Sequence, residues 1–280
     1  MSERQHPDRG WWVKFDRAQE HLDELNAGLK PLCAPREHAV SSRVESNKRP
    51  RERVYRVTFA GEPDERWPLL VGDFLFNLSC ALDHLAVALN PANRRNKLIY
   101  FPIYVDDPWR QADGTRRYVE RSPTNRKIFS DSTRHMLPEA QALIKWTQPY
   151  AEALEAGKDA DDHVLSLLKR FHTTDKHRRL VVGDIGCVSG VLTYPNKVGV
   201  TVTEPFVAPT DRLVKNDAPI KRLNYQVDMK FVGSLRVAFA HREPRVTKLG
   251  VGPFLGADHL PAISKGVEDR LRLLETYVQW

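Results

Sequence analysis

Residues 69–90 read LLVGDFLFNLSCALDHLAVALN, and the rest of the predicted fold is arranged around this segment. Its apolar residues recur at steps of three and four along one broad face, and Phe76, Cys80 and Val87 cover much of the opposite side. A helix that is apolar nearly all round belongs at the centre of a fold rather than on its surface. We therefore expect a buried central helix that carries Asp83-His84.

Outward from this stretch, the hydrophobic period distinguishes helices from strands. Helical spacing precedes it at 15–29 and follows it at about 138–155, at 161–177 and from about 261 to the C-terminus. Alternating apolar residues predict a β-hairpin at 40–60 and several antiparallel strands between 180 and 240. The sequence thus predicts an α+β fold, in which a helical bundle around a buried central helix packs on an antiparallel β-sheet.

The same pattern predicts how the chain divides. Residues 1–10 are polar and are typical of a disordered tail, whereas residues 11–280 are typical of a single α+β domain. We expect that domain to be helical over 11–180 with the hairpin at 40–60, mainly β over 180–258, and to end in a helix at 260–279. A two-stranded hairpin is not stable by itself, so we expect it to pair with the later strands.

The chain carries 43 Lys and Arg against 36 Asp and Glu, a formal net charge of +7. This mixed surface allows RNA or another polyanion as a partner without requiring one. The three cysteines, Cys33, Cys80 and Cys187, include no C-x-x-C pair, as suits a reducing cytoplasm. Residues 1–10 lack the apolar core of a signal peptide, and no apolar run approaches the ~18 residues that span a bilayer, so we expect no membrane partner.

Four polar residues of the central helix, Asp73, Asn77, Cys80 and His84, follow one another at steps of four, three and four. At about 100° per residue they share one side of the helix. One interpretation is an internal site in which His84 and Asp73 bind a metal or move a proton. The alternative is a structural hydrogen-bond network, or a narrow strip that faces solvent or the edge of the sheet.

A second polar group, Asp175-Lys176-His177-Arg178-Arg179, ends the helix predicted at 161–177. Asp175 lies four residues after Phe171, on the apolar side of that helix, so its carboxylate would need a buried partner. His84, Arg178 or a backbone amide could serve, and the sharpest hypothesis pairs it with His84. The alternative is a basic cluster that complements the C-terminal end of the helix dipole.

Arg170 and His177 share one face of the same helix, with six residues between them. In a ribonuclease the histidine would act as a general acid or base and the arginine would stabilise phosphate charge. An ordinary solvated helix face explains the same spacing. The candidate catalytic residues are therefore His84, Asp175, His177 and Arg170, and the candidate metal ligands are Asp73, His84 and Asp175.

The motif Leu82-Asp83-His84-Leu85, followed about ninety residues later by Asp175-Lys176-His177-Arg178, resembles a group of uncharacterised bacterial proteins, mainly from actinobacteria. The resemblance covers the helical half of the chain well and the β half only loosely, and it implies no activity. A fainter similarity is to HEPN-type helical proteins, some of which are ribonucleases that use an Arg followed four to six residues later by a His. In similar proteins an Arg often stands where this chain has Ser79, so that version of the motif is absent here.

Between residues 93 and 127 the chain is basic and irregular, with aromatic residues interleaved. Cations and aromatic rings can hold a nucleic-acid backbone and stack bases. A loop that wraps a core has the same composition. The candidate residues of this polyanion surface are Arg94, Arg95, Trp109, Arg116 and Arg117.

Familiar motifs do not match: residues 250–256 have one residue too many for the dinucleotide fingerprint, and neither G-x-S-x-G nor H-E-x-x-H occurs. A divalent metal remains open as a cofactor. The sequence therefore favours a bacterial cytosolic binding or interaction protein without a catalytic centre. The alternative is a HEPN-like ribonuclease or another phosphate-directed hydrolase that uses His177 with Arg170, or His84 with Asp175. Trp11-Trp12 allow a homo-oligomer, although packing of the first helix onto the bundle explains them equally well.

Overall fold

The computed structural model of the chain describes residues 9–45, 52–59, 64–90, 99–107, 123–157, 159–177, 180–207, 217–241 and 255–278. It divides into two compact units, each built from separate stretches of sequence. The helical unit comprises residues 1–23, 70–178 and 258–280, and the sheet unit comprises residues 24–69 and 179–257. The predicted α+β class is confirmed. Each unit draws on both halves of the chain, and the single domain expected over residues 11–280 stays a prediction.

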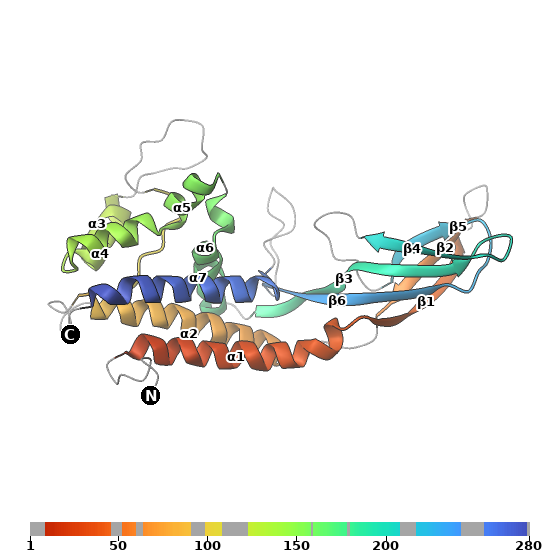
Figure 1. The fold of residues 1–280 in the computed structure, drawn as a ribbon, viewed down its shortest axis with the longest axis horizontal. Coiled ribbons are helices and arrows are strands. Elements are labelled where there is room, and N and C mark those ends of the chain that lie inside the picture. Colours follow the sequence, from red (N-terminus) through yellow and green to blue (C-terminus); the bar gives the residue numbers. More distant parts are fainter. Residues whose placement is uncertain are drawn as a thin grey trace. The chain divides into compact units, whose positions relative to one another are not determined.

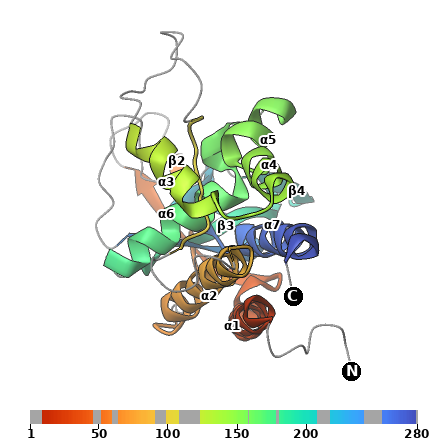
Figure 2. The same cartoon turned by 90° about the vertical axis from the view of Figure 1, so that its left-hand side faces the viewer.

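The helical unit is built mainly from α2, α6 and α7, with the first part of α1 and three shorter helices. Figures 1 and 2 show α2 beside α1 and α7. Both α1 and α2 extend from one unit into the other. The helices are α1 (Gly10–Cys33), α2 (Trp67–Ala88), α3 (Pro123–Thr133), α4 (Pro138–Trp146), α5 (Pro149–Ala156), η3 (Ala160–Asp162), α6 (Val164–His177), α7 (His259–Leu274) and η4 (Glu275–Tyr277).

Helix α2 is the central helix that the sequence predicts. One broad face is removed from solvent, and Val71, Phe74 and Leu78 have no exposed surface. Burial is one-sided rather than nearly complete, because Phe76 is 49% exposed and Val87 36% exposed. These two residues lie on the same side of the helix as Asp73 and His84, which are also exposed.

Among the described helices, α2 is long and apolar enough to cross a membrane by length and composition. The expectation that no apolar run approaches a membrane span was therefore too strict. Of its most apolar window, 61% is buried inside the protein, as in the core helix of a soluble protein, which passes the same test.

The two tryptophans at the start of α1 are part of the core of the helical unit. Trp11 and Trp12 are each 1% exposed. The indole Nε1 of Trp12 donates to Glu275 Oε2 over 2.8 Å, and the Arg272 guanidinium lies 5.4 Å from the Trp12 ring centroid. Packing of the first helix onto the bundle therefore accounts for the tryptophan pair. The predicted C-terminal helix is observed as α7 followed by η4.

The sheet unit contains one antiparallel sheet in the order β4-β3-β6-β1-β2-β5, with β7 paired to β6. The predicted hairpin is confirmed as β1 and β2, and it joins the later strands through β6 on one side and β5 on the other. The strands are β1 (Arg36–Glu45), β2 (Glu52–Thr58), β3 (Leu180–Pro195), β4 (Thr201–Val207), β5 (Ala218–Leu223), β6 (Lys230–His241) and β7 (Leu255–Gly256).

The sheet curls until its two edge strands, β4 and β5, lie side by side (Figure 1). Side chains join the edges: Lys221 Nζ of β5 donates to Glu204 Oε1 of β4 over 2.6 Å and lies 5.5 Å from the ring centroid of Tyr194. The hydrogen bond to Glu204 raises the pKa of Lys221 above its ordinary value. An ion pair thus closes the seam between two strands that are not neighbours in the ladder.

Two glycines make room for the aromatic core inside the curled sheet. Gly190 of β3 and Gly233 of β6 are paired across the ladder, and the Phe231 ring lies against both. His38 packs edge-on to Phe59, and its Nε2 donates to the carbonyl oxygen of Gly233 over 3.1 Å. Nδ1 of His38 is buried without a hydrogen-bond partner among the described residues, and burial lowers the pKa of this imidazole.

Replacing Gly190 by alanine tests this close approach. A Cβ at Gly190 would lie 2.6 Å from Phe231 Cζ and from the Val232 carbonyl oxygen. We expect Gly190→Ala to lower the free energy of unfolding by about 1–3 kcal/mol in urea denaturation, as overpacking does. Ser189→Ala, at the exposed neighbouring position, should stay within about 0.5 kcal/mol of the parent. Equal stability of the two variants would contradict the packing of Phe231 on Gly190.

Candidate functional site

The polar stripe of α2 does not form an internal site. Asp73 and His84 are exposed, Cys80 is half-buried, and Asn77 is buried. Nδ2 of Asn77 donates to the carbonyl oxygen of Asp73 over 2.8 Å, so the helix itself provides its partner. In the part of the chain that the structure describes, no three His, Cys, Asp or Glu side chains gather as metal ligands would.

His84 of α2 lies against Gly10, the first residue of α1. A Cβ at Gly10 would stand 2.7 Å from Nδ1 of His84, so the absence of a side chain at Gly10 lets the ring approach the helix. Although His84 is an exposed residue, this edge of the ring is covered. Burial lowers the pKa of His84, and the positive charge of Lys14 lowers it further. Both effects favour the neutral imidazole, which can accept a proton.

Asp83 has a structural partner in the segment that follows α2. Its Oδ1 accepts a hydrogen bond from the backbone N–H of Phe101 over 2.8 Å. Gln148 holds the same segment: Nε2 donates to the carbonyl oxygen of Pro102 and Oε1 accepts from the N–H of Tyr104, each over 2.9 Å. We call residues 99–107 the strap. Phe101 and Tyr104 of the strap are buried.

The structure describes only part of the second predicted group. Asp175 and His177 lie in the last turn of α6, but their side chains fall outside the described residues, so the pairs His84–Asp175 and Arg170–His177 stay predictions. Arg170 Nη2 donates to Asp161 Oδ1 over 2.8 Å. That ion pair holds the guanidinium at the N-terminal end of α6.

The predicted polyanion residues also fall outside the described part of the chain. Arg94 and Arg95 precede the strap, and Trp109, Arg116 and Arg117 follow it. The structure therefore leaves this surface as a prediction.

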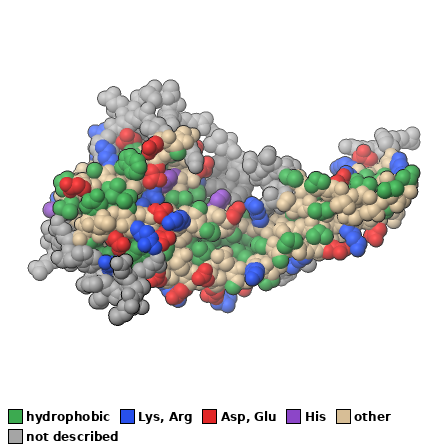
Figure 3. Space-filling model, viewed as in Figure 1, with side chains coloured by type: hydrophobic (Ala, Val, Ile, Leu, Met, Phe, Trp, Pro, Cys, Tyr) green, Lys and Arg blue, Asp and Glu red, His purple; other side chains and the backbone are tan. Residues whose placement is uncertain are grey.

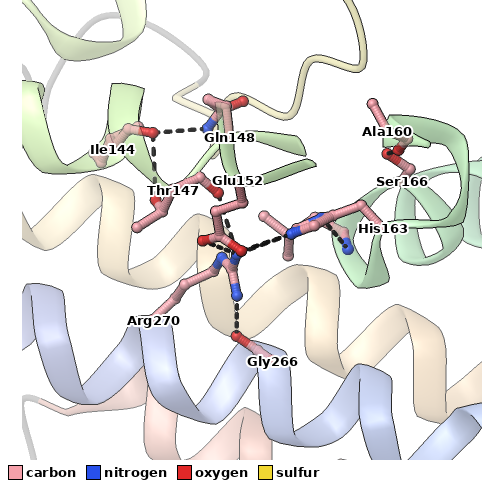
Figure 4. Close-up of polar contacts among 10 residues, drawn as sticks. Ile144, Thr147, Gln148, Glu152, Ala160, His163, Ser166, Gly266 and Arg270 are labelled. Carbon is pink, nitrogen blue, oxygen red and sulfur yellow. Dashed lines mark hydrogen bonds and ion pairs between the residues drawn. The ribbon is translucent and has the colours of Figure 1, made fainter. Parts of the chain in front are cut away.

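A buried charged cluster that the sequence reasoning missed joins α5, α6 and α7 (Figure 4). Arg270 of α7 is 5% exposed, and its Nη2 donates to Glu152 Oε1 over 2.6 Å and to the carbonyl oxygen of Thr147 over 3.2 Å. Its Nη1 donates to the carbonyl oxygen of Gly266 over 2.8 Å. The other carboxylate oxygen of Glu152 lies 2.8 Å from Nε2 of His163.

Local geometry fixes the tautomer of His163. The residue immediately precedes α6, and its Nδ1 accepts the N–H of Leu165 over 3.2 Å, as an N-cap side chain does. Nδ1 is therefore unprotonated, and the proton on Nε2 is donated to Glu152. Because Nε2 carries that proton, the 3.3 Å approach of Arg270 Nη2 is a contact rather than a hydrogen bond. His163 thus has no free lone pair with which to act as a base.

The charges of the cluster balance each other. Burial alone would raise the pKa of Glu152, but the hydrogen bond from His163 and the charge of Arg270 outweigh it and lower that pKa below 4.5. The carboxylate is held ionised by the hydrogen bond from His163 and by the guanidinium of Arg270. We interpret the cluster as a tie among three helices, because the Glu152 carboxylate, both Nη atoms of Arg270 and both ring nitrogens of His163 have partners within the protein. Nε of Arg270 is buried without a hydrogen-bond partner among the described residues.

Glu152→Gln tests this tie. The substitution keeps the shape of the side chain but leaves the buried guanidinium of Arg270 without a countercharge, which destabilises a protein strongly. The Glu152 side chain is 33% exposed, so we expect a partly screened loss of about 2 kcal/mol in the free energy of unfolding. Glu155→Gln, on the exposed side of the same helix, is the matched control. Equal loss in both variants would contradict this role.

The same carboxyl predicts a pH dependence. Its pKa is lowered in the folded protein, so its contribution is complete above the ordinary value of 4.5 and is lost as the pH falls through the folded value. We therefore expect the stability difference between the parent and Glu152→Gln to shrink as the pH is lowered below about 4.5. A difference that stays constant in acid would contradict this ionisation state.

His84 offers an independent test of the α1–α2 contact. The charge of Lys14 lowers its pKa, so Lys14→Gln should raise the pKa of His84, as followed by NMR titration of the imidazole protons. Lys30→Gln removes the same charge from the last turn of α1 and should leave the His84 titration unchanged. Equal shifts in both variants would mean that Lys14 does not act locally on His84.

Comparisons with known proteins found nothing similar. No family model, no curated protein and no solved structure matches the chain.

Proposed function

We propose that this protein binds a polyanion, with RNA as the leading candidate, through its sheet unit. The observation that carries the proposal is the distribution of charge. The helical unit contains 23 Lys and Arg and 23 Asp and Glu, whereas the sheet unit contains 20 Lys and Arg against 13 Asp and Glu. The whole formal excess of seven positive charges therefore belongs to the sheet unit.

Electrostatic attraction to phosphates supplies most of the affinity of proteins that bind nucleic acid without sequence preference. A unit with a net positive charge attracts such a chain, whereas a unit of zero formal charge offers only local patches. In the helical unit, the charged cluster is occupied by its own members, since Glu152 binds both His163 and Arg270. These facts favour binding at the sheet unit over chemistry at that cluster.

The second candidate function is a hydrolase that acts on RNA or another phosphate compound. It is favoured by His84, an exposed imidazole that burial and Lys14 keep neutral near physiological pH. The same hypothesis includes His177 as a general acid or base and Arg170 as the residue that stabilises phosphate charge.

RNA binding is the first test of the proposal. We expect the purified full chain to bind short mixed-sequence RNA in a fluorescence anisotropy assay, with an association constant that falls steeply between about 50 and about 200 mM salt. The fall reflects the release of counterions when basic side chains replace them at the phosphates. No binding even at the lowest salt concentration would refute the proposed function.

The same reactions separate binding from hydrolysis. Binding without cleavage is expected, with or without a divalent metal, in the parent protein and in His84→Ala and His177→Ala. Cleavage that is lost in either variant would support the hydrolase instead. Equal cleavage in all three proteins would point to a contaminating nuclease, and the anisotropy result would then decide the proposal alone.

A further inference from the structure

One end of the curled sheet carries a cluster of basic side chains, which we call the rim. The antiparallel register places its members toward the same end of the strands: Lys230 begins β6 and pairs with Thr193 near the end of β3, and Arg53 of β2 pairs with Leu223 at the end of β5. Lys197 lies in the turn that follows β3. The rim comprises Arg43, Arg53, Lys197, Lys221, Arg222 and Lys230.

The rim is positive after its ion pairs are counted. Glu204 pairs with Lys221, and Glu52 lies 3.6 Å from Arg222. Among the described residues, no carboxylate pairs with Arg43, Arg53, Lys197 or Lys230, while Asp228 is the nearby acidic side chain in the β5–β6 connection. Figure 3 shows basic side chains in blue, with acidic ones in red, over the region of β2, β4 and β5.

A tyrosine ring, that of Tyr225, lies next to one of these basic side chains. Tyr225 is half-buried, and Lys197 Nζ lies 5.5 Å from its ring centroid. The hydroxyl of Tyr55 fixes the backbone here, since it accepts the N–H of Val227 over 2.8 Å and donates to the carbonyl oxygen of Tyr225 over 3.3 Å. The backbone that carries the ring is thus held in place, and the lysine beside the ring is exposed.

Cations around a fixed aromatic ring suit a flexible anionic chain whose bases are unpaired. The phosphates would be attracted by the lysines that have no carboxylate partner among the described residues. A base can stack on the face of an aromatic side chain, and this stacking tolerates any sequence because every base has a flat aromatic face. In a duplex the base faces are covered by their neighbours, so the ring would add nothing. We infer that the rim binds single-stranded nucleic acid, with phosphates at Lys197 and Lys230 and one base on Tyr225, an inference that rests on the proposed function.

The test removes two lysine charges from the rim and compares that variant with one that lacks two lysine charges elsewhere. In Lys197→Gln/Lys230→Gln, the slope of log association constant against log salt should become shallower by about 0.7 per lysine, or about 1.4 in total, on single-stranded RNA. Lys145→Gln/Lys265→Gln removes two exposed lysines of the helical unit, in α4 and α7, and should leave the slope unchanged. Circular dichroism checks that both variants are folded.

The tyrosine is tested separately. Tyr225→Leu should weaken binding of single-stranded RNA about tenfold, as loss of one stacked base does, whereas Tyr225→Phe should bind like the parent. A duplex of the same length should bind Tyr225→Leu and the parent equally.

The outcomes distinguish the two proposals. Absence of RNA binding by the parent protein would refute the proposed function and this inference with it. Binding by the parent with equal slopes for the rim pair and the control pair would refute the rim alone. The rim would also be refuted if Tyr225→Leu bound single strands as tightly as Tyr225→Phe.

Discussion

Burial of one face of α2 constrains what can pack around it in the helical unit. A backbone that crosses such a face loses water and must find its hydrogen bonds within the protein. The strap solves this problem through Asp83, which accepts the N–H of Phe101, and through Gln148, which bonds to both Pro102 and Tyr104. Asp83 is therefore best understood as the residue that lets an irregular segment lie against an apolar helix, and His84, its neighbour in sequence, is directed to the surface instead.

The sheet unit meets a different constraint, because an open sheet leaves two edges with unpaired backbone groups. Here the edges β4 and β5 approach each other, and Lys221 with Glu204 joins them through side chains. Pro205 within β4 has no N–H, which suits a strand at the edge. The curl itself needs space on the inside, and the paired glycines Gly190 and Gly233 give that space to the Phe231 ring. Closure and core packing are thus two aspects of one arrangement.

Periodicity was enough to predict α2, the first hairpin and the later strands, because each depends on contacts that repeat within the element. Periodicity could not show what the polar stripe of α2 faces, because a stripe that faces solvent, another helix or a cavity has the same spacing. The sequence does indicate that Arg270 is buried, because it occupies a position on the apolar stripe of α7, between Val267 and Leu274. Its partner Glu152 lies 118 positions away in sequence, and no local pattern predicts a contact at that separation.

The two units arrange their charges differently, and this difference affects which unit can attract a polyanion. On α7, Lys265 with Asp269 and Arg272 with Glu268 form pairs four residues apart, a spacing that a helix offers along its whole length. A strand places its cross-strand neighbours on other segments of the chain, so a sheet offers no such regular spacing for ion pairs. Lys221 and Glu204 pair because the curl brings the two edge strands together. Cations at strand ends and turns, such as Lys197 and Lys230, are left facing solvent. Their attraction extends about 8 Å at physiological salt, so an anionic chain would meet it first at this end of the sheet.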